Sequence, residues 1–103
     1  MRDVTDRDFD HIIKQAGQPV LVEFWKPGCG SCRALRRELE KLEPDVTGKV
    51  LILNMNAEEN FQIPAELEIT SLPVLALYRQ GEFERFIGGL GTREEIFKQL
   101  RLT

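Results

Sequence analysis

The sequence predicts an α/β domain in which one mixed β-sheet is covered by helices on both faces. Apolar runs typical of buried strands alternate along the chain with charged amphipathic runs typical of helices. Two strands joined by a helical crossover come first and a hairpin comes last, so the sheet should contain parallel and antiparallel pairs. Because no repeat, low-complexity tract or linker interrupts the 103 residues, we expect one domain over residues 1–103.

The first predicted helix has Thr5 or Asp6 as its N-cap and ends before Gly17 and Pro19. His11 is the only histidine, and we expect it at the surface rather than as a ligand or base. The apolar stripe of this helix is formed by Phe9, Ile12, Ile13 and Ala16.

The next elements form a strand, helix and strand unit. Residues 20–25 are nearly all apolar, as in a strand covered on both faces, and Pro27-Gly28 can stop it. An amphipathic helix follows, and residues 44–48 connect it to a second buried strand at residues 50–56. The inward face of the helix carries Leu35, Leu39 and Leu42.

The last third of the chain predicts a short helix, a hairpin and a final helix. The short helix lies around residues 64–67, and the strands at 74–78 and 83–87 are joined by a turn at 79–82. The second of these strands alternates, which suits a half-exposed edge. A capping box opens the final helix at residues 92–95, and its inward side chains should be Ile96, Phe97 and Leu100.

Composition and charge exclude several function classes. The net charge is −3 with acids and bases mixed, which argues against nucleic-acid binding and against a polybasic membrane patch. No apolar run approaches the length of a membrane span. The polar start at residues 1–6 does not look like a signal peptide, so we expect a cytoplasmic protein.

Both cysteines, Cys29 and Cys32, lie where the first strand meets the amphipathic helix. A bridge across two residues constrains the unfolded chain very little, so reactivity explains the pair better than a structural role. Cys29 precedes the helix, whose unpaired N–H groups and dipole stabilise a thiolate, and we expect it to attack a disulfide. Cys32 lies one turn further and should resolve the mixed disulfide.

Four other residues around the pair are candidates for the site. Gly30 permits a tight approach in the loop, and Ser31 offers an N–H and a hydroxyl that can stabilise a thiolate. Glu23 is the one polar residue of its strand. If Glu23 is buried, its pKa should rise and its carboxylate can act as the base for Cys32. The alternative is that Glu23 lies at the sheet edge or that its side chain reaches solvent. We expect Trp25 to pack under the loop.

Taken together, these residues resemble the thioredoxin family, in a variant with Cys-Gly-Ser-Cys at residues 29–32. The resemblance rests on residues 21–25, on that motif, on Leu72-Pro73 before a strand, and on Gly81 and Gly88 around the last strand. It implies a thioredoxin fold and a protein-disulfide reductase that works by dithiol–disulfide exchange. Disulfide-containing proteins would be its substrates and a thioredoxin reductase its electron donor. The resemblance also implies a monomer with no metal and no cofactor besides the redox-active disulfide.

The resemblance also implies a substrate-facing surface. Pro73 should be cis and face the cysteine pair, and the backbone of Leu72 should offer hydrogen bonds to an extended substrate segment. Met55, Gly88 and Gly89 are further candidates for this surface.

Several departures from the family pattern affect substrate choice and redox potential rather than the reaction. Gly28 stands where the family has a tryptophan, and Glu23 stands where it has an aspartate. An apolar residue, Ile52, is expected in place of a lysine on the neighbouring strand. The other departures are Ser31 and Val74 in place of a proline and a threonine, and Arg36-Arg37 in place of a helix proline.

Three alternatives to a disulfide reductase remain. One is a redox-sensing interaction domain, in which oxidation of the pair changes partner binding. Another is a thioredoxin-like protein that forms or isomerises disulfides. The third is a metal or iron–sulfur module, which would need ligands from a partner chain because two thiols and one distant histidine do not complete a four-ligand site.

Overall fold

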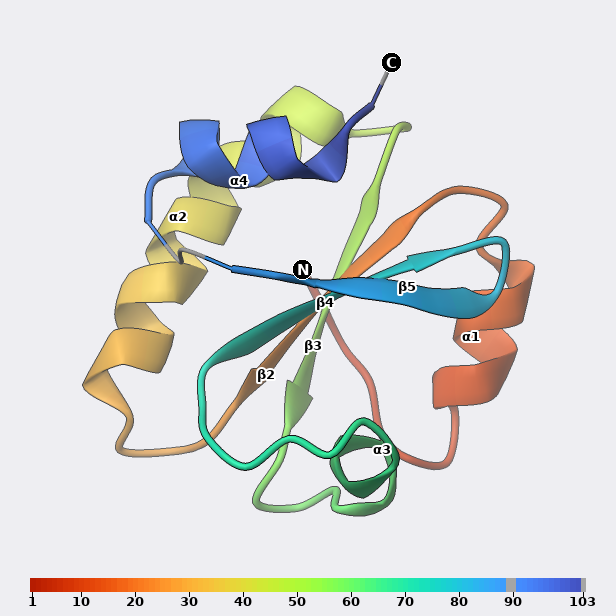
Figure 1. Cartoon of the computed structure of the whole chain (residues 1–103), viewed down its shortest axis with the longest axis vertical. Coiled ribbons are helices and arrows are strands. Elements are labelled where there is room, and N and C mark those ends of the chain that lie inside the picture. The colour runs from red at the N-terminus through yellow and green to blue at the C-terminus, as the bar shows by residue number, and fades with distance from the viewer. Residues whose placement is uncertain (89–90, 103) are drawn as a thin grey trace.

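A five-stranded mixed sheet forms the centre of the computed structural model, which describes residues 1–88 and 91–102 (Figure 1). The strand order is β1-β3-β2-β4-β5, with β1, β2 and β3 parallel to one another and β4 antiparallel to both neighbours. The predicted class and the crossover between β2 and β3 are confirmed. The bounds are β1 Arg2–Asp3, β2 Val20–Trp25, β3 Leu51–Asn56, β4 Val74–Arg79 and β5 Glu82–Ile87.

Helices cover both faces of the sheet, as predicted. Figure 1 shows α1 (Phe9–Gln15) and α3 (Gln62–Glu66) on one side, and α2 (Gly30–Val46) and α4 (Arg93–Leu100) on the other. Each side has its own core, because alternate residues of a strand point to opposite faces: Val22 and Phe24 enter one core, and Leu21 enters the other. Within the described part of the chain, no helix is both long and apolar enough to cross a lipid bilayer.

Three details of the helices and strands differ from the predictions. The two-residue strand β1 was not predicted, because so short a segment produces no hydrophobic pattern. Pro44 lies inside α2 rather than after it; Pro44 and Glu40 are both exposed, so water can replace the hydrogen bond that proline cannot donate. Phe97 is 41% exposed rather than inward, because Ile96 and Leu100 alone fill the buried stripe of α4.

The start of α1 also differs from the prediction. The N-cap position of α1 is Asp8, whose Oδ1 accepts a hydrogen bond from Thr5 N at 2.8 Å. Asp6 instead accepts hydrogen bonds from the backbone N–H groups of Gln62 and Ile63, both at 2.9 Å. It therefore caps α3, a helix more than fifty residues away in the sequence, rather than the helix that follows it.

We expect Asp6→Ala to lower the free energy of unfolding by about 1–2 kcal/mol, because two N–H groups at the start of α3 lose their acceptor. Urea denaturation measures the difference. Asp10→Ala is the matched control: Asp10 is exposed in the first turn of α1, and its loss should change stability by no more than about 0.5 kcal/mol. Equal losses in the two variants would contradict the capping role.

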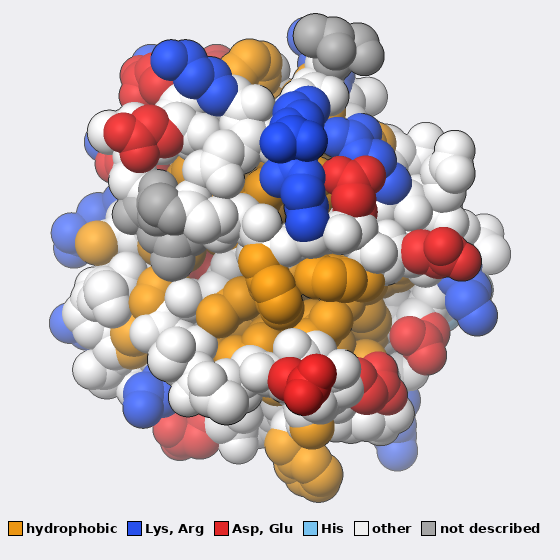
Figure 2. All heavy atoms as spheres, in the orientation of Figure 1, with side chains coloured by type: hydrophobic (Ala, Val, Ile, Leu, Met, Phe, Trp, Pro, Cys, Tyr) orange, Lys and Arg blue, Asp and Glu red, His pale blue; other side chains and the backbone are white. Residues whose placement is uncertain are grey.

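The hairpin of β4 and β5 is confirmed, with β5 at the edge of the sheet. Gln80 and Gly81 both have positive φ angles (53° and 80°), which a two-residue hairpin turn with the right-handed strand twist requires. Exposed Phe83 and Phe86 lie on β5 with ring centroids 4.9 Å apart. Figure 2 shows apolar side chains gathered on this face.

Candidate functional site

The cysteine pair lies at the corner between β2 and α2. Strand β2 ends at Trp25, and the chain turns through Gly28, whose φ of +78° lies in the left-handed region that favours glycine. Cys29 is the N-cap residue of α2, with an extended backbone, and the helix starts at Gly30. A tryptophan at position 28 would be strained in this backbone, which gives a local reason for the departure from the family pattern.

The two sulfurs have different environments. Cys29 is partly exposed, whereas Cys32 is 3% exposed, and the two form a disulfide with their Cα atoms 5.2 Å apart. Cys29 Sγ accepts a hydrogen bond from Cys32 N at 3.1 Å and lies 3.5 Å from Ser31 Oγ. The same two groups can stabilise a Cys29 thiolate when the disulfide is reduced. The predicted difference in exposure is confirmed, and the Ser31 hydroxyl lies near the Cys29 sulfur in the disulfide form.

Gly30 does not have the steric role expected of it. Apart from its chain neighbours and its own helix, a Cβ atom at this position would meet no atom of residues 1–88 and 91–102 within 4 Å, and the residue begins an ordinary helix. The close backbone approach expected there is therefore absent, and the conformational requirement for glycine in this corner falls on Gly28 instead.

Glu23 is fully buried, so the alternative of an edge or solvent-reaching position is wrong. Burial raises its pKa from 4.5 to about 7, and the nearby Arg36 guanidinium offsets part of this shift. Arg36 Nε lies 3.6 Å from Glu23 Oε1, which makes an ion pair but not a hydrogen bond. Neither carboxyl oxygen has a hydrogen-bond partner among the described residues. At neutral pH this carboxyl can therefore either hold or release a proton.

Asn54, not Ile52, lies beside Glu23 on the neighbouring strand. The parallel register pairs Glu23 with Asn54 and Leu21 with Ile52. Asn54 is buried, and its Oδ1 has no hydrogen-bond partner within residues 1–88 and 91–102. This polar neighbour of Glu23 was not predicted, because a single sequence does not specify the register between strands.

Arg36 supplies a cation to the site that sequence reasoning missed. Its guanidinium carbon lies 4.8 Å from the ring centroid of Trp25, in a cation–π contact, while its Nε faces Glu23. The signal was present in the spacing, because Arg36 follows Cys32 by one helical turn and shares its face. Trp25 is partly buried beside the loop, as predicted.

The topology brings the proposed substrate-facing residues to the same edge of the sheet as the cysteine corner. Phe24 pairs with Val74, and Leu75 pairs with Ile87, so the start of β4 and the end of β5 lie beside the end of β2. The Leu72-Pro73 bond is cis, as predicted.

The individual members of the predicted substrate surface differ in exposure. Leu72 and Pro73 are partly exposed, and Gly88 is exposed. Met55 is fully buried in the core under α1 and α3, so its place on the surface was wrong; a strand with both faces covered does not reveal which side chains are accessible. Gly89 lies outside the described residues.

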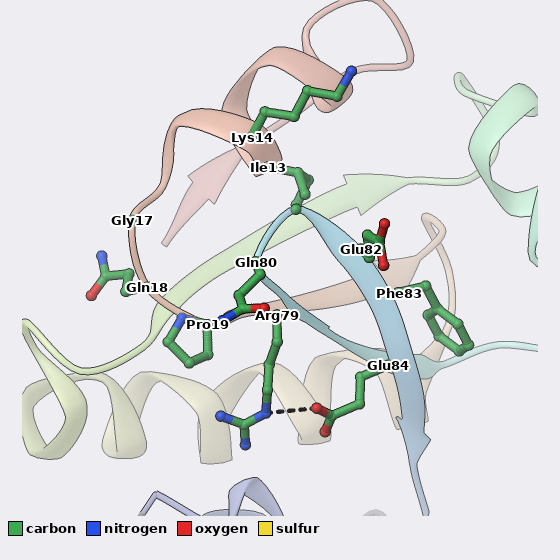
Figure 3. Close-up of a pocket in the computed structure, with 11 residues that line it drawn as sticks. Ile13, Lys14, Gly17, Gln18, Pro19, Arg79, Gln80, Glu82, Phe83 and Glu84 are labelled. Atoms are coloured by element: carbon green, nitrogen blue, oxygen red, sulfur yellow. Dashed lines mark ion pairs between the residues drawn. The ribbon is translucent and has the colours of Figure 1, made fainter.

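A larger cavity, of about 780 Å³, lies at the opposite end of the sheet, between the end of α1 and the hairpin of β4 and β5 (Figure 3). Arg79 and Glu84 form an ion pair there at 2.8 Å, and the described residues that line the cavity include no cysteine or histidine. Size alone does not assign a function, and the redox-active residues are at the other end of β2.

The partly exposed Cys29 lies at the start of a helix and is bonded to the shielded Cys32 one turn later. This arrangement defines a protein of the dithiol–disulfide exchange class. The thioredoxin family profile matches residues 1–101. Similar proteins include the thioredoxins of Rickettsia bellii (39% identical, covering 92% of this chain and 90% of the relative) and Haemophilus influenzae (35% identical, 77% and 74%). Another is the thioredoxin of Staphylococcus aureus (34% identical, 94% and 91%).

The chain belongs to the thioredoxin family, and the predicted thioredoxin fold is confirmed. It is a thiol–disulfide oxidoreductase of the protein-disulfide reductase type. Its general partners are disulfide-containing proteins and a reductase that returns the pair to the dithiol form.

Proposed function

We propose that Cys29 is the attacking residue, Cys32 the resolving residue and Glu23 the proton acceptor in the reduction of protein disulfides. The observation that carries this assignment is the asymmetry of the pair: Cys29 is partly exposed and receives the Cys32 N–H at 3.1 Å, whereas Cys32 is 3% exposed. The accessible sulfur with a nearby donor is the better thiolate nucleophile.

The exchange proceeds in two steps. The Cys29 thiolate attacks one sulfur of the substrate disulfide, forms a mixed disulfide and releases the other substrate sulfur as a thiolate. Glu23 then accepts the Cys32 proton through water, and the Cys32 thiolate attacks Cys29 Sγ. This breaks the mixed disulfide, frees the second substrate thiolate and leaves the Cys29–Cys32 disulfide. Two electrons have passed from the pair to the substrate, and a thioredoxin reductase then supplies two further electrons that reduce the Cys29–Cys32 disulfide again.

We further propose a cytoplasmic monomer that maintains the thiols of other proteins and uses no cofactor besides its own disulfide. A reducing compartment supplies the reductases that such a pair needs and keeps accessible thiols reduced. The substrate would lie along the edge where Leu72, Pro73 and Gly88 meet the cysteine corner.

Trapping with Cys32→Ser tests the assignment of the two sulfurs. This variant keeps the attacking thiol and cannot resolve the mixed disulfide, so it should retain a protein or peptide disulfide through Cys29. Peptide mapping of the adduct identifies the linked residue. A failure to form any adduct, in a variant that remains folded and has a reactive Cys29, would contradict the mechanism.

The Cys-Gly-Ser-Cys loop should make this protein more oxidising than a thioredoxin with proline at position 31, whose potential is about −270 mV. The Ser31 hydroxyl lies within hydrogen-bond distance of Cys29 Sγ, and stabilising the thiolate of the reduced form raises the potential. We expect Ser31→Pro to lower the potential by tens of mV, where about 30 mV corresponds to 1.4 kcal/mol.

Equilibration with glutathione measures this potential. Ser31→Ala is the matched variant, because it keeps the backbone N–H and removes only the hydroxyl. An unchanged or higher potential in Ser31→Pro would contradict the role of serine, and an unchanged potential in Ser31→Ala would assign the effect to the backbone.

A further inference from the structure

A small cleft of about 250 Å³ lies beside the cysteine pair, on the side of α2. We call it the cationic cleft, because Lys26, Arg33 and Arg36 line it together with the shielded sulfur-bearing residue Cys32. Its remaining lining consists of Trp25, Pro27 and Gly28. Among the described residues, no carboxylate lines the cleft, so an approaching substrate meets positive charge and apolar surface there.

The positive charge of the cleft is available to a ligand. Lys26 and Arg33 are exposed, and neither forms an ion pair with a described acidic residue. Arg36 is shared between the face of Trp25 and the buried Glu23, with only a 3.6 Å contact to the carboxyl. The local charge is therefore positive in a chain whose net charge is −3.

Gly28 keeps the cleft open next to the loop. It contributes no side chain, and a Cβ atom built on it would meet no atom within 4 Å in the described part of the chain, its two chain neighbours aside. The large aromatic side chain that thioredoxins carry before the first cysteine is thus replaced by open space bordered by cations.

We propose that the cationic cleft binds a carboxylate that the substrate carries beside its disulfide, so that the protein prefers anionic disulfides. This inference rests on the proposed function and names the substrate chemistry of the same site. The carboxylate stays unchanged while the two exchange steps take place at the sulfurs. A small disulfide with carboxylate arms and a protein disulfide next to an Asp or Glu both present this chemistry.

The test compares three small disulfides of different charge: 3,3′-dithiodipropionate (anionic), hydroxyethyl disulfide (neutral) and cystamine (cationic). For each disulfide, the rate of its reaction with the reduced protein is divided by the rate of its reaction with dithiothreitol. This ratio removes differences in intrinsic reactivity among the three disulfides. The anionic disulfide should have the highest normalised rate. The double variant Lys26→Gln, Arg33→Gln should lower the ratio of anionic to neutral rates by about threefold to tenfold at low salt. This change is about 0.7–1.4 kcal/mol for the two charges together, because each exposed charge pair contributes about 0.2–1 kcal/mol.

A charge-matched control separates the cleft from the general field of the protein. Arg37 and Lys49 are exposed and do not line the cleft, so Arg37→Gln, Lys49→Gln removes the same charge elsewhere. An unchanged ratio in the cleft variant, or an equal loss in both double variants, would overturn the proposal. If the protein reacts with none of the three disulfides faster than dithiothreitol does, the proposed function fails instead.

A second arm uses a disulfide-bonded peptide with Glu or Gln next to its cysteine. A preference for the Glu peptide that the cleft variant loses assigns the carboxylate to protein substrates. If the cleft variant loses its preference only for dithiodipropionate, the carboxylate belongs to small disulfide substrates. The proposal is overturned when neither arm shows a loss specific to the cleft variant.

Discussion

Cys29→Ser should reduce the rate of insulin reduction to that of the uncatalysed reaction. A serine hydroxyl does not ionise near neutral pH, so the accessible attacking group is lost and no mixed disulfide forms. Cys32→Ser should also stop turnover, but it should still complete one attack and release one substrate thiol. Insulin reduction in the presence of dithiothreitol measures turnover, and a single-turnover thiol assay separates the two variants.

The order of alkylation of the reduced protein provides an independent check. With limiting iodoacetamide at pH 7, Cys29 should be modified well before Cys32, because Cys32 is 3% exposed. Thermal denaturation of both serine variants controls for folding. Preferential modification of Cys32, or turnover retained in Cys29→Ser, would reverse the assignment of the two sulfurs.

The second large effect is expected at Glu23 and depends on pH. Burial raises the pKa of Glu23 from 4.5 to about 7, so the folded state binds the proton more tightly than the unfolded chain. Folded-state stability is therefore lost as the pH rises from about 4.5 to 7. Glu23→Gln resembles the protonated acid; below pH 4.5 it should match the unmodified protein, and above pH 7 it should be more stable by on the order of 3 kcal/mol.

Urea denaturation at several pH values measures this difference. The exposed Glu58 provides the control, because a substitution at such a surface position should change stability by no more than about 0.5 kcal/mol. A stability difference between Glu23→Gln and the unmodified protein that does not grow with pH would show that Glu23 is not a raised-pKa group.

The same substitution should change the kinetics. Glutamine cannot accept the Cys32 proton, so the resolving step should slow and lose its dependence on pH around 7, while the first attack by Cys29 continues. Rapid-quench analysis of the mixed disulfide separates the two steps. A resolving step with unchanged rate and pH profile would remove Glu23 from the mechanism while leaving the stability prediction intact.

The parts of the structure that the sequence predicted well are those with a local physical signal. The apolar run of β2 and the hairpin turn at Gly81 lie where their residues indicated, and the pair Cys29 and Cys32 lies at the predicted corner. Each of these features depends on residues close together in the sequence. The local signals are the residue pattern of a strand, a glycine that can adopt a positive φ and the residues that start a helix.

The parts that could not be predicted depend on contacts between distant segments. Asp6 caps α3, which is distant in the sequence. The residues around Asp6 indicate only that it can cap a helix, and they do not indicate which helix. The register of β3 decides that Asn54 lies beside Glu23 and that Met55 faces the core. Arg36 reaches Glu23 only because α2 packs over β2. Topology and register, which a single sequence leaves open, determine these details.

The central place of β2 in the strand order β1-β3-β2-β4-β5 affects how the molecule tolerates damage. Transient fraying at either margin of the sheet breaks backbone hydrogen bonds of β1 or β5 first and leaves the innermost strand paired on both sides. Amide hydrogen exchange should accordingly be slowest in Leu21, Val22 and Phe24. Because Cys29 follows this most protected strand, the protein can keep its redox chemistry through local unfolding events that would disable a site built on an outer strand.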